Sequence, residues 1–525
     1  MGSGCGSDAA EALPARATGV DVEDGVVGKV EFEKRPMVGF GVLGGKSSVV
    51  RRPARHVRVD VLRADGKLIA TTVTDAEGRY GVAGAMPEGY RVLAFAESPA
   101  DVEPFIPVRV LDRSGSDYAV SSQPQSRVRE GDKSVVDLVA SVDSSNRVAG
   151  AFNIVDAMQT SAKIWVAKTG IRPAPAIVRW QSGGTEQPGT FFQRGTNEIS
   201  ITGGLGSVQD STDTDEFDDA VISHEYWHFL QSNHAFSSSP GGPHSTEPIV
   251  PLLAFEEAFG DWFGVFSHGS SLYEDSIGNE DGKPMCGFCD DLERSMWRTS
   301  KGIASEQSIY EILWDLADGH EGQPDSTDPE FVTVDAGALL EAILAFHPQK
   351  DVFELGTFLE KLLDTGAVTE AEVRSILTAP IDHDVTFPPL DRDVPSTGRD
   401  LFPIPLVPGS VVQGEVDATQ RLSGAHANVE RGFHSIRYYA LRLDAPRRVT
   451  ITLRIEGTGQ TPEDLDLRLL TPDQRVLAVS DSSTPVETIT RDLASGTYLV
   501  AVFGFFLDNR GNAIANRGRF TLEVD

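Results

Sequence analysis

The sequence has too few basic residues to balance its acidic ones, and it lacks a long apolar run. Its 525 residues include 46 lysines and arginines against 78 aspartates and glutamates, which gives a formal net charge of −32. Such a polyanion repels phosphate backbones and anionic lipid surfaces, so nucleic acid is excluded as a partner. Because no stretch of about 20 consecutive apolar residues occurs, we expect no transmembrane helix.

Cysteine is scarce as well, since the chain has only three. Cys286 and Cys289 form a Cys-Gly-Phe-Cys motif, which would indicate redox chemistry in a reducing compartment. Neither a preceding strand nor a surrounding βαβ unit is predicted there, and a structural zinc site needs four ligands rather than two. We therefore predict a local disulfide between Cys286 and Cys289 in an exported protein, with a redox protein as a rival hypothesis.

The first residues contain neither a basic nor an apolar region, so no signal peptide is apparent in the sequence. Ser3-Gly4-Cys5 resembles the end of a bacterial lipobox, whose cysteine carries a lipid after export. The alternative is an N-terminal cysteine without a role. We expect an exported bacterial protein, either secreted or held at the cell surface by a lipid on Cys5, with a disordered tail over residues 1–19.

The length exceeds the roughly 250 residues that one core supports, which predicts several domains. Residues 20–145 alternate apolar and polar side chains between turn signals such as Asp65-Gly66, a pattern typical of antiparallel β structure. Residues 25–97 resemble the carboxypeptidase regulatory-like, transthyretin-like β-sandwich, chiefly through DGKLIATTVTDAEGRYGV and the later PEGYRVLAF. The resemblance implies a packing or adhesion module. The predicted strands are 58–62, 68–73, 80–82 and 90–95.

Residues 146–385 change to apolar spacing of helical period, mixed with short β runs at 177–180 and 198–201, which predicts an α+β domain. The predicted helices are 152–169, 218–231, 252–266, 307–317, 336–346 and 352–363.

The last part of the chain returns to β structure after a linker, rich in proline and aspartate, at 386–408. Residues 409–525 resemble the bacterial pre-peptidase C-terminal domain, a small β-sandwich, through YYALRLDAPRRVTITL, DLDLRLLTPDQ and SGTYLVAV. The fold class expected is therefore multidomain, with an α+β domain flanked by N- and C-terminal all-β sandwiches. The predicted strands are 438–443, 448–454, 466–470, 476–480 and 497–503.

The strongest functional signal is His224-Glu225-Tyr226-Trp227-His228, within a stretch of helical character. Residues four apart share one face of a helix, so both imidazoles converge on one point. The intervening Glu225 reaches a water on the same metal, which is the arrangement of a metal-dependent hydrolase. The motif also arises by chance, so a second signal is needed.

That second signal is the helix predicted at 252–266, where Glu257 and Asp261 lie one turn apart. Catalytic zinc usually has three protein ligands and one open position, and a carboxylate that accepts a ligand histidine's other N–H fixes its tautomer. Phe255, Phe259 and Trp262 surround both acids, and carboxylates among such side chains are unfavourable unless they are paired or metal-bound.

Together these helices resemble the gluzincins, the thermolysin-like and fungalysin-like metallopeptidases. The resemblance implies that His224, His228 and Glu257 bind Zn²⁺, that Glu225 is the general base and that Asp261 contacts a ligand histidine. Glu256 is the competing ligand candidate, but only Glu257 is followed by an aspartate four residues later.

One expected residue is missing. The helix at 308–318 resembles the fungalysin helix that follows an oxyanion-stabilising histidine, yet the corresponding position, near Thr299, holds no histidine. The oxyanion stabiliser therefore stays unassigned, with Arg298, Tyr310 and His320 as candidates.

Two further features surround the motif. Residues 197–202 occupy the place of the gluzincin edge strand that pairs with an extended peptide, and a plain structural strand is the alternative. Acidic residues crowd the next loop, which predicts either a Ca²⁺ site or, as the favoured alternative, a solvated acidic loop. They are Asp210, Asp213, Asp215, Glu216 and Asp218.

These observations predict a zinc-dependent endopeptidase that hydrolyses protein or peptide substrates with Glu225 as the general base. The rival hypothesis is an inactive gluzincin scaffold that serves as a surface adhesion or binding protein between two β-sandwiches. The sequence leaves the cleavage preference and the oligomeric state open.

Overall fold

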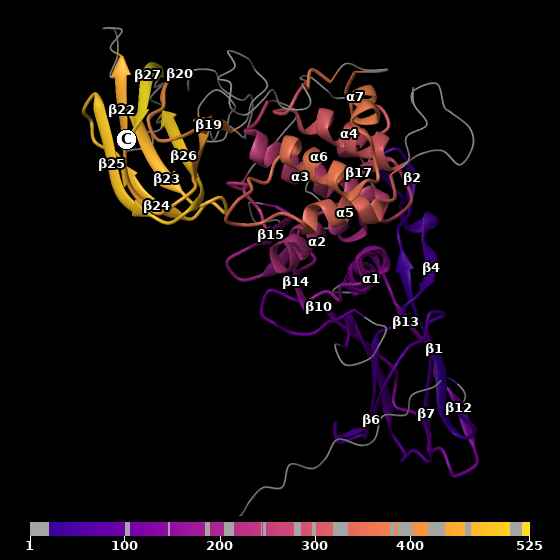
Figure 1. Ribbon diagram of the computed structural model, residues 1–525. Coiled ribbons are helices and arrows are strands. Elements are labelled where there is room, and N and C mark those ends of the chain that lie inside the picture. The colour runs from indigo at the N-terminus through magenta and orange to yellow at the C-terminus, as the bar shows by residue number, and fades with distance from the viewer. Residues whose placement is uncertain are drawn as a thin grey trace, which may run out of the picture. The chain divides into compact units, whose positions relative to one another are not determined.

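Figure 1 shows the computed structural model. The chain forms two compact units. The first comprises Met1–Val166, Arg172–Phe229 and Glu274–Cys289, and the second Ala167–Ile171, Leu230–Tyr273 and Asp290–Asp525. The described residues are 20, 22–99, 106–144, 147–183, 189–203, 215–242, 244, 248–277, 285–296, 301–318, 334–378, 383–385, 403–417, 436–456, 464–504 and 517–525. Cys5 and the predicted tail lie outside this part of the chain, as does most of the predicted linker.

The N-terminal part of the first unit is a pair of β-sheets, as the alternating sequence predicts. The long strand β1 pairs with β12 and β7 through its first half and with β13 and β4 through its second half, and the other sheet has the order β11-β8-β5-β6. Alternate side chains of β5 and β8 are buried, so each strand turns one face inward. The strands are β1 (Gly25–Lys34), β2 (Met37–Gly39), β3 (Val42–Leu43), β4 (Val50–Pro53), β5 (Arg58–Leu62), β6 (Leu68–Val73), β7 (Arg79–Ala83), β8 (Arg91–Phe95), β11 (Ala119–Ser121), β12 (Lys133–Val135) and β13 (Leu138–Ala140).

A mixed sheet and two helices follow. The sheet has the order β15-β16-β14-β10-β9, in which β10, β14 and β16 run parallel and β15 is antiparallel to β16. The first helix is buried through much of its length and contacts the second through Trp165 and Trp227, whose ring centroids are 6.3 Å apart. The elements are β9 (Glu97–Ser98), β10 (Val108–Leu111), α1 (Ala149–Thr169), β14 (Ala176–Trp180), β15 (Phe191–Gln193), β16 (Glu198–Ile201) and α2 (Asp219–His234).

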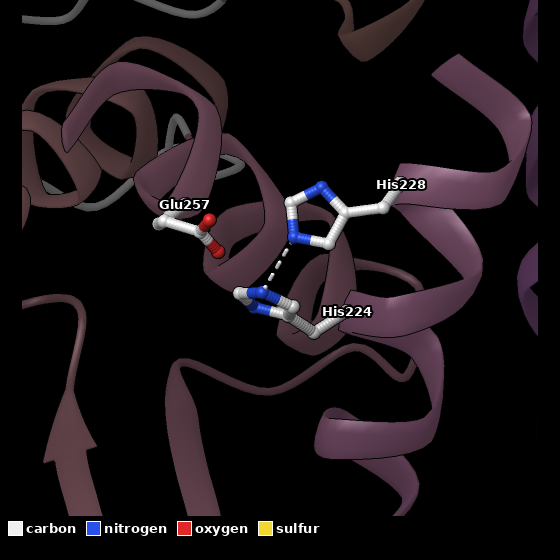
Figure 2. A group of neighbouring side chains, drawn as sticks. All are labelled: His224, His228 and Glu257. Atoms are coloured by element: carbon white, nitrogen blue, oxygen red, sulfur yellow. Dashed lines mark hydrogen bonds between the residues drawn. The ribbon is translucent and has the colours of Figure 1, made fainter. Parts of the chain in front are cut away.

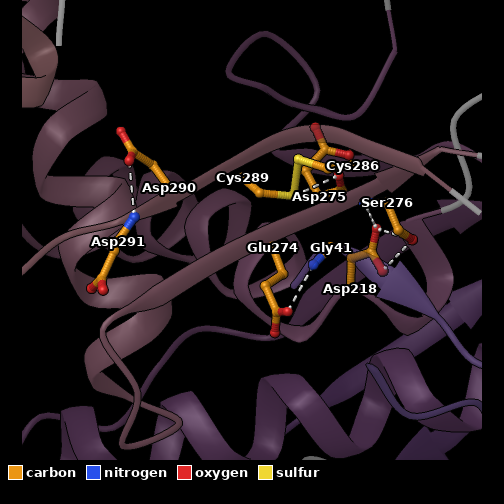
Figure 3. The surroundings of a disulfide bond; sticks show 9 residues. All are labelled: Gly41, Asp218, Glu274, Asp275, Ser276, Cys286, Cys289, Asp290 and Asp291. Carbon is orange, nitrogen blue, oxygen red and sulfur yellow. Dashed lines mark hydrogen bonds between the residues drawn. A yellow bond between two sulfur atoms is a disulfide. The ribbon is translucent and has the colours of Figure 1, made fainter. Parts of the chain in front are cut away.

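The hairpin β17 (Leu272–Ile277) and β18 (Met285–Asp291) carries the predicted disulfide between Cys286 and Cys289 (Figure 3). The disulfide prediction is confirmed. The expectation that no strand precedes the motif is wrong, because β17 pairs with the strand that contains both cysteines. The turn between β2 and β3 meets this disulfide, and the Gly41 N–H donates to the Glu274 carboxylate over 2.9 Å.

Five whole helices, α3 to α7, lie in the second unit among its described residues. They are labelled in Figure 1. Pro251 occupies the first turn of α3, where its missing N–H is not needed, and Ser305 caps α4 by accepting from the Ser308 N–H. α3 and α4 pack against each other. The helices are α3 (Pro251–Phe266), α4 (Glu306–Ala317), α5 (Ala336–Leu344), α6 (Leu355–Thr365) and α7 (Glu370–Thr378).

The C-terminal part of the second unit is a β-sandwich, as predicted. Its two sheets have the orders β19-β21-β26-β23-β24 and β20-β27-β22-β25. Between them lies a core of buried aliphatic side chains with Tyr439 and Phe520. The strands are β19 (Ile404–Leu406), β20 (Val411–Asp417), β21 (Ile436–Leu443), β22 (Arg447–Glu456), β23 (Leu465–Leu470), β24 (Val476–Ser480), β25 (Val486–Leu493), β26 (Gly496–Gly504) and β27 (Arg517–Val524).

The predicted fold class is confirmed, since a helical region follows one β-rich region in the chain and precedes a second. The exact domain limits stay a prediction. Among the described residues, no helix combines the length and the apolar character that crossing a bilayer requires.

The edge-strand prediction needs a correction. β16, which corresponds to the predicted run 197–202, is an internal strand because it pairs with β14 on one side and β15 on the other. Among the described strands, the edge at this end of the sheet is β15.

Gly41 and Gly66 offer a matched test of the contact with the disulfide. Both have positive φ, 64° and 84°, so an alanine at either position costs roughly 1–2 kcal/mol in backbone strain. A methyl carbon on Gly41 would also lie 2.1 Å from Cys289 Sγ, whereas nothing lies within 4 Å of the same position on Gly66. We expect Gly41→Ala to destabilise the first unit by about 1–3 kcal/mol more than Gly66→Ala. Chemical denaturation followed by limited proteolysis measures this difference, and equal losses would contradict the contact.

Candidate metal centre

Two histidines project from the same face of α2. His224 is 3% exposed and its Nε2 lies 3.0 Å from His228 Nε2, with one nitrogen donating and the other accepting (Figure 2). The ring centroids are 4.7 Å apart. This proximity follows from the spacing of four residues, which places both side chains on one helical face.

The third member of the group is Glu257 on α3. Its carboxylate faces the two imidazoles in Figure 2, and one ligand atom from each of the three residues lies within 4.8 Å of the others. Glu257 is only 7% exposed. Two imidazole nitrogens and a carboxylate oxygen that converge in a buried space form a group that could hold a metal ion.

Glu256, the competing candidate, is occupied elsewhere. It is 4% exposed and accepts a hydrogen bond from the Ser237 hydroxyl. It does not belong to either group of described residues whose atoms could surround a metal ion. The helical period explains the difference, because neighbouring residues point about 100° apart around the axis.

The remaining predicted residues lie near this group in the sequence and are buried. Glu225 follows His224 on α2 and is 9% exposed, and Asp261 lies one turn after Glu257 on α3 and is 2% exposed. The roles of Glu225 as base and of Asp261 as partner of a ligand imidazole stay predictions.

Two residues near Glu257, namely His244 and Glu306, were not predicted from the sequence. His244 Nε2 lies 3.4 Å from Glu257 Oε2, and its Nδ1 lies 2.9 Å from Glu306 Oε2. Burial raises the pKa of Glu306 to about 7, against the opposing effect of His244. The available signal was a histidine in the segment between the two motif helices, although nothing in the sequence pairs it with Glu306.

The candidates for oxyanion stabilisation divide into two groups. Arg298 and His320 lie outside the described residues. Tyr310 is fully buried and its hydroxyl donates to Asp290. Burial, followed by the nearby Asp290 charge, raises the pKa of Tyr310 far above its ordinary value, so this hydroxyl stays protonated.

The acidic residues before α2 form a second group. The favoured expectation of a solvated loop is wrong for Asp215, Glu216 and Asp218, which are at most 1% exposed. Their carboxylates have partners far away in sequence. Thr190 donates to Asp215, Arg147 to Glu216, and both the N–H and the hydroxyl of Ser276 to Asp218.

Asp215, Asp218 and Asp275 each offer an oxygen within 4.8 Å of the others, and the group could hold a metal ion. Figure 3 shows Asp218, Asp275 and Ser276 beside the disulfide. Carboxylate oxygens alone suit hard cations such as Ca²⁺. This group shares Asp215 and Asp218 with the residues predicted from the sequence, whereas Asp275 was not among them. Asp210 and Asp213 lie outside the described residues.

Glu257 and Glu256 allow a matched test of the metal group. Glu257→Gln should weaken the binding of a Co²⁺ probe by more than the roughly 10–100-fold typical of an outer-shell loss, because an amide replaces a charged ligand. Glu256→Gln should leave most of the affinity, since the amide oxygen can still accept from Ser237. Chelator competition on both variants measures the ratio, and a larger loss in Glu256→Gln would reverse the assignment.

No protein-family model and no curated protein sequence matches the chain. Among solved structures, the pre-peptidase C-terminal domain of collagenase from Bacillus anthracis is similar at 14% identity and a TM-score of 0.17, over 23% of this chain and 92% of that one. The periplasmic g-type lysozyme inhibitor PliG of Aeromonas hydrophila is similar at 14% identity and a TM-score of 0.15, over 23% and 97%. A carbohydrate-binding module, CBM36, solved with calcium and xylotriose, is similar at 11% identity and a TM-score of 0.13, over 21% and 99%.

Proposed function

We propose that this protein is an exported zinc-dependent endopeptidase, with His224, His228 and Glu257 as the metal ligands. The observation that carries the proposal is the convergence of these three side chains, whose ligand atoms lie within 4.8 Å of one another. Two histidines and a glutamate are a known donor set of catalytic zinc, which keeps a fourth position open.

The distances support zinc. Nitrogen ligands lie about 2.0–2.1 Å from Zn²⁺, so two of them in a tetrahedral site are roughly 3.3 Å apart. The two Nε2 atoms are 3.0 Å apart here, so a small adjustment of the rings suffices. A zinc ion held there would polarise a scissile carbonyl and lower the pKa of a bound water.

The proposed chemistry of the chain's own residues is acid–base catalysis. Glu225 lies beside His224 on α2, where its carboxylate accepts a proton from the attacking water and passes it to the leaving amine. Asp261 accepts the other N–H of a ligand imidazole and holds its tautomer.

A peptide substrate is favoured by the short strand β15, which lies at the edge of its sheet among the strands that the structure describes. Edge strands present unpaired backbone groups that bind extended peptides by main-chain hydrogen bonds. Phe192 on β15 contacts Phe229, the residue after His228, with ring centroids 6.1 Å apart. This edge therefore lies against the helix that carries both histidines.

Export is supported by the Cys286–Cys289 disulfide, since disulfides persist mainly in oxidising compartments. The same bond disfavours a free dithiol as the functional site. The inactive-scaffold alternative and the proposed peptidase differ in one observable, namely turnover.

Glu225→Gln tests the proposal directly. The variant should retain one equivalent of zinc but lose peptide hydrolysis by roughly 10²–10⁴-fold, because the amide cannot accept the proton. Elemental analysis and a fluorogenic peptide or casein assay measure the two quantities, and a chelator should abolish wild-type activity until zinc is restored. Glu341→Gln, on the exposed side of α5, is the control. Near wild-type hydrolysis by Glu225→Gln would refute the role of the base, and a zinc-loaded but inactive wild type would favour the scaffold.

A further inference from the structure

One imidazole links two buried carboxylates that come from different helices of the second unit. His244 Nε2 lies 3.4 Å from Glu257 Oε2 on α3, and His244 Nδ1 lies 2.9 Å from Glu306 Oε2 on α4. The two acids are 7% and 3% exposed. Since α3 and α4 pack against each other, the ring bridges neighbouring helices and contacts a proposed metal ligand.

The segment that precedes His244 contacts both α3 and the residues just before α6. The Ser237 hydroxyl donates to Glu256 on α3, and the Ser238 hydroxyl accepts from the Phe353 N–H over 2.8 Å. Both serines are buried. Together with the two contacts of His244, four polar contacts therefore hold this segment, and two of them involve the adjacent glutamates Glu256 and Glu257 of α3.

Glu306 fixes the orientation of the ring. It is the first residue of α4, directly after the capping Ser305, so its carboxylate lies where a helix terminus favours negative charge. Glu306 contacts Nδ1 of His244. The other ring nitrogen, Nε2, therefore points toward Glu257.

His244 lies beside the metal group and outside it. The group of mutually close ligand atoms consists of His224, His228 and Glu257 and does not include His244 among the described residues. A carboxylate that binds a metal through one oxygen usually has a hydrogen-bond partner for the other. Nε2, which is 3.4 Å from Oε2, lies just beyond the usual hydrogen-bond length and can become that partner after a small shift.

We propose that His244, held by Glu306, is a positioning residue that restrains the Glu257 carboxylate so that one of its oxygens faces the metal. The inference rests on the proposed function, because it assigns Glu257 as a ligand. In this proposal, His244 and Glu306 form a pair that restrains the Glu257 carboxylate. The segment between α2 and α3 thereby influences the zinc site.

The two amide analogues of histidine provide a sharp test. A glutamine amide nitrogen can reach the place of Nε2, whereas an asparagine nitrogen reaches only the place of Nδ1. In the full chain, His244→Ala and His244→Asn should raise the zinc dissociation constant about 10–100-fold, and His244→Gln should recover part of this loss. Glu306→Gln should shift the affinity in the same direction. His347→Ala, at an exposed histidine of the same unit, is the matched control and should bind zinc as the wild type does.

Two readouts separate positioning from other roles. Chelator competition gives the affinity, and the visible spectrum of the Co²⁺-substituted protein reports the ligand field, which should change in His244→Ala. Unchanged affinity and spectrum with a lower melting temperature would show a structural link and overturn the proposal. Unchanged affinity and spectrum with a large fall in kcat would place His244 on the substrate, which also overturns it.

Zinc binding by the wild type and by His224→Ala distinguishes failure of the proposed function from failure of the positioning role. Wild-type protein that binds no zinc, or whose zinc survives His224→Ala, would refute the ligand assignment and with it the positioning role. Wild-type protein that binds zinc through His224 while all His244 variants bind it equally well would refute the positioning role alone.

Discussion

The burial of carboxylates along α3 is the constraint on which the arrangement of the second unit depends. Of the sixteen residues of this helix, all but Phe266 are buried, and three of them are acids. A buried carboxylate without a partner is strongly unfavourable, because it loses its hydration and gains nothing in return. Ser237 compensates Glu256, and His244 contacts Glu257. The segment before α3 and the start of α4 are therefore arranged around these acids.

Buried carboxylates also have polar partners in the first unit, at the start of α2. Asp215, Glu216 and Asp218 are buried immediately before the helix that carries the two histidines. Negative charge is favourable at a helix N-terminus, and here it is also neutralised or hydrogen-bonded by residues from elsewhere in the unit. Ser276, on the hairpin closed by the disulfide, contacts Asp218. The beginning of α2 is thus held by several distant elements, which limits how far the imidazoles can move.

Features that depend on local sequence could be predicted. The strands β5, β6, β16 and β24 were predicted over the residues they occupy, because these short runs are rich in strand-forming residues and turns such as Asp65-Gly66 separate them. His224 and His228 could be placed together because residues four apart share one helical face, and Glu257 was joined to them through the resemblance to the gluzincins.

Features that depend on distant partners could not be predicted. β18 contains a glycine between two cysteines and has little strand propensity, and its pairing with β17 and the disulfide stabilise it. The short helix α7 carries too few apolar residues to show a clear period. The acidic loop was expected to be solvated because Thr190, Arg147 and Ser276 are remote in sequence from the acids that they contact. For the same reason, His244 could not be connected to Glu306.

The position of β27 in its sheet has a consequence for synthesis. This strand lies between β20 and β22, although it follows both of them in the chain by many residues. Among the described strands, β27 is the sole neighbour of β20 in this sheet and covers one edge of β22, so both edges stay open until residues 517–524 leave the ribosome. The sandwich therefore cannot form strand by strand during synthesis. Until β27 is made, the unpaired edges of β20 and β22 can pair wrongly with other nascent chains.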